Sequence, residues 1–262
     1  MARGKNRRQI LGFQGTIQSD KYADWDFIYQ TSTAKDNLYN IGDTVELADG
    51  RKFTYAKSSA ACISGQGCEF TYTGYVAITT FTVSAAVGAL SISVPAATHA
   101  ALTADELRNG YVVIYNGTDN NVQFRGIVGN DASILNVAFT LYLDASLTTA
   151  ITTSSKIEVF QNPYAALRTG TSQILAKAGV PAVAVSATSM YFWVQTGGFT
   201  WVAPQALVGA NGGMGCFWRH DGSIESATTA LGITAGTYDT SQYAGHCVTG
   251  TAAGNGPLFF LK

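Results

Sequence analysis

The chain contains few charged residues, few prolines and no long apolar run. Asp, Glu, Lys and Arg make up 13% of its 262 residues, whereas ordinary soluble domains contain roughly 25%. Because 47% of the residues are hydrophobic, the composition excludes an intrinsically disordered chain. Five prolines beside 28 glycines exclude a collagen-like one. No apolar stretch approaches the roughly 18 residues of a membrane-spanning helix, so we expect no membrane partner.

A composition of this kind produces a surface rich in small residues and poor in charge. Gly, Ala, Ser and Thr take the places of the missing charged residues. Solubility alone does not require such a surface, whereas close packing against other subunits favours it. At 262 residues the chain is long enough for one large core or two modest ones. We therefore expect a component of a larger assembly.

The positive charges are concentrated at the N-terminus. Four of them lie in the first eight residues, at Arg3, Lys5, Arg7 and Arg8, and the rest of the chain is mildly acidic, so that the net charge is −1. A basic arm suits either nucleic acid or an acidic neighbouring subunit, and a solvated terminus has the same composition. Residues 9–14 are too short and too polar for the core of a signal peptide, so we expect no Sec export.

The chain contains few cysteine and histidine residues, namely Cys62, Cys68, Cys216, Cys247, His99, His220 and His246. The spacing of Cys62 and Cys68 suits a small disulfide loop or two free thiols, and for a protein assembled in the cytoplasm we expect free thiols. Cys216, His220, His246 and Cys247 have the residue types of a zinc site. His246 and Cys247 are neighbours in a predicted strand, however, so their side chains point to opposite faces and we expect no metal.

Known catalytic patterns are missing. The glycine-rich residues 209–215 lack the Gly-Lys-Ser/Thr ending of a phosphate-binding loop, and neither a Gly-x-Ser-x-Gly elbow nor a His-Glu-x-x-His pair occurs. Asp24 and Asp26 flank Trp25, and their side chains share a face if this segment is a strand. Two carboxylates on one face suit acid–base chemistry. We favour the alternative that they lie on a solvated edge. We therefore expect neither an enzyme nor a cofactor.

The hydrophobic pattern predicts an all-β fold of short antiparallel strands in a barrel or sandwich, of the jelly-roll or β-tulip kind. Residues 42–55 form two alternating runs about Asp49-Gly50, which predicts a hairpin. Further strands are expected at residues 81–83, 89–94, 111–116, 122–128, 138–144, 156–161, 216–219 and 258–261, with turns at 116–120 and 220–223. The capping-box pattern at Thr103–Glu106, followed by Asn109-Gly110, predicts one short helix of about two turns.

The predicted division of the chain has three parts. They are an extended basic arm at residues 1–40, a β domain at 41–164 and a C-terminal β domain at 165–262, with the boundary at Asn162-Pro163-Tyr164. Within the last part, residues 190–195 and 199–202 flank Thr196-Gly197-Gly198 and predict a second hairpin. Its aromatic residues are Tyr191, Trp193 and Trp201. They suit the face of a sugar ring, but we favour a core or a subunit interface, because no cluster of Asp, Asn and Arg adjoins them.

Several segments together resemble virion structural proteins of tailed bacteriophages, particularly head-decoration or cement proteins. They are residues 42–55, the strand at 110–114, the junction at 162–164, the aromatic segment at 191–198 and the apolar C-terminal strand. The resemblance covers the layout of residues from 40 to 262. The basic arm and the longer middle section depart from the smallest proteins of this kind.

The resemblance implies a structural protein that binds the outer surface of a phage capsid and stabilises it by clamping neighbouring capsomers. Its partner would be the major capsid protein rather than nucleic acid, its oligomer a homotrimer, and its location the virion surface after assembly in the host cytoplasm. The basic arm is then the first candidate for docking, by charge and by addition to a strand edge. The alternative is a receptor- or glycan-binding β module of a tail fibre or tail tip. A virion-associated hydrolase has the least support.

Overall fold

The computed structural model describes residues 25–71, 74–116, 122–172, 175–204, 208, 214–226, 242–249 and 258–262. Antiparallel strands carry most of the regular structure in these residues, so the predicted all-β fold is confirmed. The helices within them are two short 3-10 helices, η1 (Asp26–Tyr29) and η2 (Pro163–Ala165).

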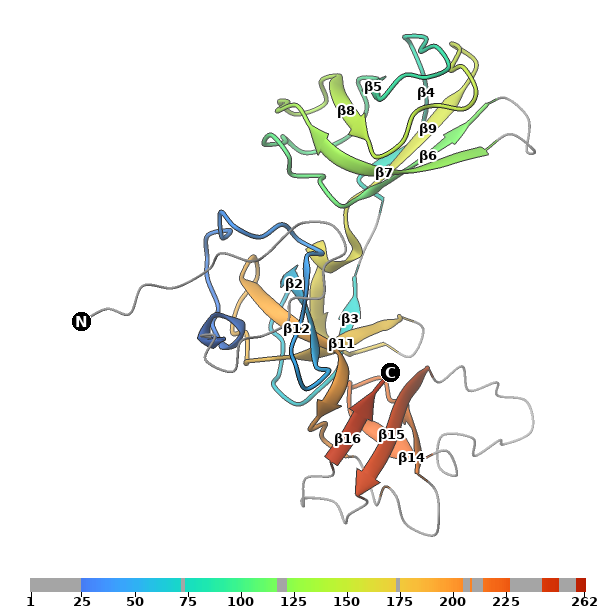
Figure 1. Cartoon of the computed structure of the whole chain (residues 1–262). Helices are drawn as coiled ribbons and strands as arrows, with labels where there is room; N and C mark the ends of the chain where they lie inside the picture. The colour runs from blue at the N-terminus through green and yellow to red at the C-terminus, as the bar shows by residue number, and fades with distance from the viewer. Residues whose placement is uncertain are drawn as a thin grey trace. The chain divides into compact units, whose positions relative to one another are not determined.

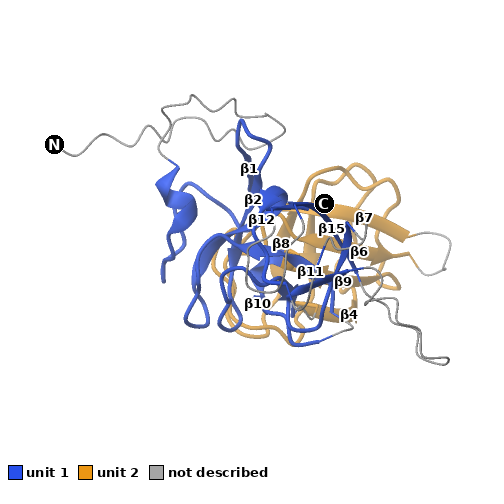
Figure 2. Cartoon of the chain, turned by 90° about the horizontal axis from the view of Figure 1, so that it is seen from below, with its two compact units in different colours: residues 1–71, 164–262 blue, residues 72–163 orange. Residues whose placement is uncertain are grey.

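The chain divides into two compact units, coloured separately in Figure 2. Unit 1 comprises residues 1–71 and 164–262, and unit 2 comprises residues 72–163. This differs from the division expected from the sequence, because residues 41–71 belong with the C-terminal part of the chain. The reason is a long-range pairing, in which β2 (Lys52–Lys57) forms a ladder with β12 (Tyr191–Thr200). Unit 2 is thus an insertion between two halves of unit 1.

Unit 1 contains a ten-stranded sheet with the order β10-β3-β11-β12-β16-β15-β13-β14, to which β2 is joined through β12 and β1 through β2. Besides β2 and β12, its strands are β1 (Thr44–Glu46), β3 (Cys68–Phe70), β10 (Leu167–Thr169), β11 (Lys177–Pro181), β13 (Gly215–Trp218), β14 (Ile224–Ser226), β15 (Tyr243–Thr249) and β16 (Leu258–Leu261). Several of them are labelled in Figure 1. Three clusters of buried side chains lie along this sheet.

The first predicted hairpin is confirmed as β1 and β2. Thr44 pairs with Thr54, and the Leu47 N–H donates to the Arg51 carbonyl at 2.8 Å. Gly50 has a φ of 84°, a conformation that glycine adopts without steric cost. The terminal strand, the strand at 216–219 and the turn at 220–223 are also found, as β16, β13 and the turn closed by Arg219 and Ser223.

The second predicted hairpin is wrong, because β12 runs through it as one continuous strand. Residues 191–197 of β12 pair with β2, and residues 198–200 pair with β16. A register shift lies between Gln195 and Gly197, and Gly198 has a φ of 84°. The Gln195 amide donates to the Gly197 and Phe199 carbonyls across this bend. Thr196-Gly197-Gly198 is therefore the place where the strand changes partners rather than a turn.

Unit 2 is a single six-stranded antiparallel sheet that curls around one core. The strand order is β4-β9-β6-β7-β8-β5. The strands are β4 (Val76–Thr80), β5 (Ser91–Val94), β6 (Tyr111–Tyr115), β7 (Val122–Asn130), β8 (Phe139–Leu143) and β9 (Lys156–Phe160). The core consists of aliphatic side chains from all six strands and from the connections between them, together with Phe81 and Phe139. The strands predicted at 89–94, 111–116, 122–128, 138–144 and 156–161 are confirmed.

Two local predictions for unit 2 are wrong. Residues 81–83 form no strand, because the strand is β4 just before them, and Phe81 inserts its ring into the core. The predicted helix is a series of turns with Asp105 at a φ of 60°. Glu106 does accept the Thr103 N–H at 2.8 Å, as a capping box requires, but the Leu107 N–H donates to the Asn130 side chain rather than to a helical carbonyl. The turn expected at 116–120 lies largely outside the described residues.

The bend in β12 predicts different effects of alanine at two adjacent glycines. A Cβ on Gly198 would lie 2.6 Å from the Gly50 carbonyl oxygen, at a positive φ, whereas one on Gly197 would meet only Lys52 carbons at 3.6 Å or more. Gly198→Ala should therefore lower the free energy of unfolding by about 2 kcal/mol or more, and Gly197→Ala should leave it nearly unchanged. Urea unfolding measures both variants. Equal effects would contradict the assigned bend.

Candidate functional site

An apolar face lies on the outer side of the unit 2 sheet. Val112 and Ile114 of β6 are fully buried, so the alternating residues of this strand, Tyr111, Val113 and Tyr115, point away from the core. The same alternation applies to β7 and β9. The residues that point outward at these positions are Tyr111, Val113, Tyr115, Val122, Phe124, Lys156, Glu158 and Phe160, of which all but Lys156 and Glu158 are aromatic or aliphatic. We call this set the β6–β7 face.

The register of the strands brings these side chains into rows. Val113 pairs with Phe124 on one side and with Glu158 on the other. The rings of Tyr111 and Phe124 stack, with their centroids 5.3 Å apart and their planes at 17°. Phe124 is 58% exposed and Tyr111 is 38% exposed. Stacked rings exposed to this extent are typical of a contact surface, because aromatic side chains are enriched at interfaces.

Polar groups fix the edges of the β6–β7 face. The Tyr115 hydroxyl donates to Glu158 Oε2 at 3.2 Å. Partial burial, this hydrogen bond and the carboxylate charge raise the pKa of Tyr115, so the hydroxyl remains a donor at neutral pH. Arg125 donates to the Phe124 and Ser146 carbonyls, which holds the backbone beside the exposed ring. These hydrogen bonds position the Tyr115 side chain and the backbone at Phe124.

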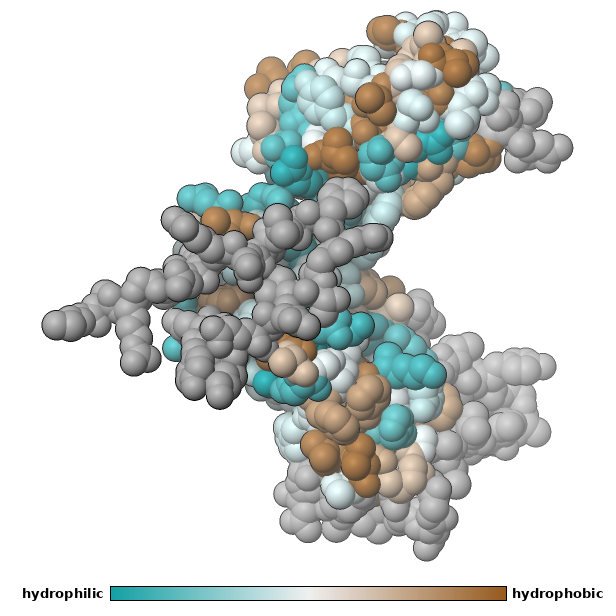
Figure 3. Space-filling view, viewed as in Figure 1, coloured by the Kyte–Doolittle hydropathy of each residue, from teal (hydrophilic) through white to brown (hydrophobic). Residues whose placement is uncertain are grey.

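Hydrophobic side chains are also exposed elsewhere on unit 2. In the hydropathy view of Figure 3 they lie among pale and hydrophilic residues on the visible surface of this unit. The exposed ones outside the β6–β7 face include Ile78, Val83, Val87, Leu90, Ile134 and Leu135. Of these, Ile134 is 72% exposed and lies in the connection between β7 and β8.

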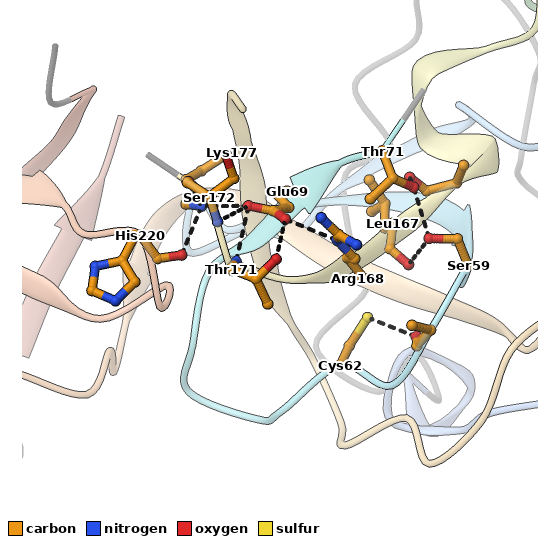
Figure 4. Close-up of polar contacts among 12 residues, drawn as sticks. Ser59, Cys62, Glu69, Thr71, Leu167, Arg168, Thr171, Ser172, Lys177 and His220 are labelled. Atoms are coloured by element: carbon orange, nitrogen blue, oxygen red, sulfur yellow. Dashed lines mark hydrogen bonds and ion pairs between the residues drawn. The ribbon is translucent and has the colours of Figure 1, made fainter. Parts of the chain in front are cut away.

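Unit 1 contains a buried charged centre, shown in Figure 4, around Glu69 of β3. The Glu69 carboxylate accepts hydrogen bonds from five groups: Lys177 Nζ at 2.8 Å, Arg168 Nε at 2.9 Å, the Thr171 N–H and hydroxyl at 3.0 Å, and the Ser172 N–H at 3.1 Å. Lys177 Nζ also donates to the Ser172 and His220 carbonyls. This centre therefore joins β3, β10, β11 and the turn at 219–222.

Electrostatics keep this centre ionised. Burial by itself would raise the pKa of Glu69, but the hydrogen bonds from Lys177, Arg168 and the backbone N–H groups lower it to about 2. Glu69 is completely buried, and the side chain of Lys177 is nearly so. Because the acceptors of Glu69 and the three donors of Lys177 are engaged within the protein, the arrangement suits stabilisation rather than substrate binding.

The three aromatic residues singled out from the sequence have different environments. Trp193 is 2% exposed and packs edge-on against Tyr39 at 4.9 Å, so it belongs to a core. Tyr191 is partly buried and stacks on Tyr55. Trp201 is 48% exposed, and its indole ring lies against Gly65. Trp193 is therefore a core residue, whereas Trp201 is a surface residue.

Other candidates from the sequence are placed as follows. All four cysteines are free and buried, and His246 is exposed on the side of β15 opposite to Cys247. Within the part of the chain that the structure describes, no three His, Cys, Asp or Glu side chains are grouped as metal ligands. Asp26 lies in the 3-10 helix η1 rather than in the expected strand. Arg3, Lys5, Arg7, Arg8, Asp24 and residues 209–213 lie outside the described residues.

Sequence reasoning missed the β6–β7 face. The signal was the run Tyr-Val-Val-Ile-Tyr at residues 111–115, which is apolar at every position rather than at alternate ones. A strand of a single sheet that buries only one face should alternate with polar residues. An unbroken apolar run therefore predicts that both faces of the strand are apolar, including the face that points away from the core.

Comparisons with known proteins identify no relative: no family model, curated protein or solved structure matches the chain. Among the described residues, no helix has the length and apolar character needed to cross a membrane.

The buried charged centre predicts a specific dependence of stability on pH. The pKa of Glu69 is lowered from 4.5 to about 2, so the ionised carboxylate stabilises unit 1 above pH 4.5, and this contribution is lost as the pH falls towards 2. It amounts to roughly 3 kcal/mol. Glu69→Gln leaves the ammonium of Lys177 buried without its counter-ion and should cost about 3–5 kcal/mol at neutral pH. Urea unfolding of both proteins across this pH range measures the difference.

Glu46→Gln is the matched control, because Glu46 forms an exposed pair with Lys52 at 3.5 Å, and such pairs contribute about 0–1 kcal/mol. Equal losses for the two variants would contradict the role of the buried centre. So would a difference between wild type and Glu69→Gln that stays constant from neutral pH to pH 2.

Proposed function

We propose that the protein is a structural component of a phage virion that binds the outer surface of the capsid and stabilises it by clamping neighbouring capsomers. The observation that carries this proposal is the β6–β7 face, an outward-facing set of mostly aromatic and aliphatic side chains on unit 2. The low charge content of the chain supports it as well, because a weakly charged surface is inexpensive to desolvate at an interface.

Contact energy alone is sufficient for this function. Complete burial of a Phe or Val side chain contributes about 1.5–3 kcal/mol, and the face offers several such side chains. A protein that binds the assembled shell but not its separated subunits stabilises the shell by mass action. Many copies on one particle multiply a modest energy per site. Such a mechanism requires no chemical step.

The proposal includes two further elements that the sequence resemblance implies. The partner would be the major capsid protein, and the decorating protein would be a homotrimer on the virion surface. The basic arm at Arg3, Lys5, Arg7 and Arg8 would add electrostatic attraction to an acidic shell. The β6–β7 face would then supply the apolar part of the contact and the arm the charged part.

A substitution on the β6–β7 face tests this proposal. Phe124→Gln removes an exposed ring without disturbing the core, so the variant should fold as the wild type does and should bind capsids about 10- to 100-fold more weakly, as a central aromatic contact residue predicts. Binding is measured by sedimentation of the purified protein with capsids that lack it.

Ile134→Gln is the control, because Ile134 is 72% exposed on the same unit but lies outside the face. Its capsid affinity should remain close to that of the wild type. Equal affinities of Phe124→Gln and the wild type would reject the face as the docking surface. Deletion of residues 1–20 tests the arm separately, and unchanged occupancy of the capsid would reject its role.

One observation favours a second function, a glycan-binding module of a tail fibre or tail tip. Trp201 presents an indole ring that is 48% exposed, and Phe199, two residues earlier in the chain, is 43% exposed. Flat exposed rings of this kind suit the apolar face of a sugar. Trp193 contributes nothing to such a platform, because it is buried in the core.

A glycan array separates the two functions. The capsid proposal predicts no glycan signal for the wild type and none for Trp201→Ala. Binding of a defined glycan by the wild type, lost at least 10-fold in Trp201→Ala while Phe124→Gln retains it, would instead support the tail module. Substitution at Trp201 is suitable because its ring is at the surface, whereas Trp193→Ala would open a cavity in the core.

A further inference from the structure

Two cysteine side chains meet in the core of the C-terminal strands of unit 1. Cys216 lies on β13 and Cys247 lies on β15, and both are buried in the same hydrophobic cluster. Their Sγ atoms are 3.3 Å apart. Cys62 and Cys68 also occupy one cluster and their side chains interact, and Cys62 Sγ contacts the Ala60 carbonyl as well, at 3.7 Å. Cys216 and Cys247 lie on two paired strands, so that a disulfide between them would link β13 to β15.

The pairing of the strands explains why these two thiols meet. Cys216 pairs with Gly245, and Cys247 follows two residues later, so both side chains point to the same side of the sheet. Gly245 has no side chain to separate them. The register shifts beside Cys216, and the Cys247 N–H donates to the Met214 carbonyl at 2.8 Å. The backbone on both sides of the contact is thus held by the ladder.

We propose that Cys216 and Cys247 are a site of covalent modification, at which thiol–disulfide exchange with a small-molecule disulfide joins β13 to β15. In the first step one cysteine loses its proton, and its sulfur attacks the small disulfide, of which oxidised glutathione is the model. A mixed disulfide forms and one glutathione thiolate leaves, taking up a proton. The second cysteine then loses its proton and attacks the first sulfur, so the protein disulfide forms and the second glutathione leaves. The two electrons and two protons of the protein thiols thus pass to two glutathione thiols.

Burial controls the rate of this reaction. Burial and the neighbouring thiol raise the pKa of Cys216 to about 12, and burial also raises the pKa of Cys247. The attacking species is the thiolate, so exchange is slow at neutral pH and faster at alkaline pH. It also requires a local opening of the strands. The pair therefore stays reduced in the cytoplasm and is expected to close in an oxidising medium.

The disulfide would add a covalent link to the ladder between β13 and β15. Cys216 and Cys247 are 31 residues apart in sequence, and cross-linking a loop of that length limits the unfolded chain. We expect the midpoint of thermal unfolding to rise by about 5–10 °C on oxidation. This inference is independent of the proposed capsid binding.

Peptide mapping of the full chain tests the inference. The purified protein is incubated with oxidised glutathione at mildly alkaline pH, its remaining thiols are alkylated, and it is digested with trypsin without reduction. Cys216 lies in the tryptic fragment 178–219 and Cys247 in the fragment 220–262, whereas Cys62 and Cys68 share the fragment 58–108. We expect fragments 178–219 and 220–262 to be joined, and to separate on reduction.

Two variants serve as controls. Cys247→Ala should abolish the linked fragments and the rise in the unfolding midpoint, while Cys62→Ala should retain both. Complete alkylation of both fragments, or glutathione adducts without any linked species, would overturn the inference. If Cys247→Ala fails to fold, the wild-type map and its reduction still decide the question, because the linked fragments are observed directly.

Discussion

The antiparallel pairing of β12 with three other strands is the interaction on which unit 1 depends. β12 forms ladders with β2, β11 and β16, so residues from both halves of the unit are joined through it. Its side chains reinforce these ladders, because Trp193 packs among Tyr39 and Tyr55 in one buried cluster. The bend at Gly198 allows β12 to pair with β2 before the bend and with β16 after it. Without β12, β1 and β2 would lose the ladder that joins them to the C-terminal half, and β3 alone would remain paired with it, through β10 and β11.

The scarcity of charge connects the interior of the protein with its surface. Some of the few charged groups are used inside unit 1, where Glu69 and Lys177 tie β3 to β11 and to the turn at 219–222. A chain with 13% charged residues then has few left to cover its outer strands, and unit 2 exposes stacked rings on its sheet. The buried Glu69–Lys177 pair thus stabilises the interior, and the low number of charged residues leaves a surface suited to contact.

The sequence predicted those parts of the fold whose signals are local. The Asp49-Gly50 hairpin, five strands of unit 2 and the C-terminal strand follow from alternation and turn residues. The helix at residues 103–110 was wrong because Asn130, distant in sequence, takes the backbone N–H of Leu107. The prediction of a turn at 196–198 was wrong because glycines occur at bends within strands as well as in hairpin turns. The inserted unit, the centre at Glu69, the contact between Cys216 and Cys247 and the rows of the β6–β7 face all depend on strand pairing between distant segments. That pairing is not readable from a single sequence.

We propose that the protein acts by contact, with the β6–β7 face of unit 2 against a larger shell. Electron cryomicroscopy of purified particles tests this claim most directly. The account predicts density for the protein on the outer surface of the capsid, with Tyr111 and Phe124 buried against the major capsid protein. Absence of the protein from intact particles, or density in which this face points to solvent, would contradict it.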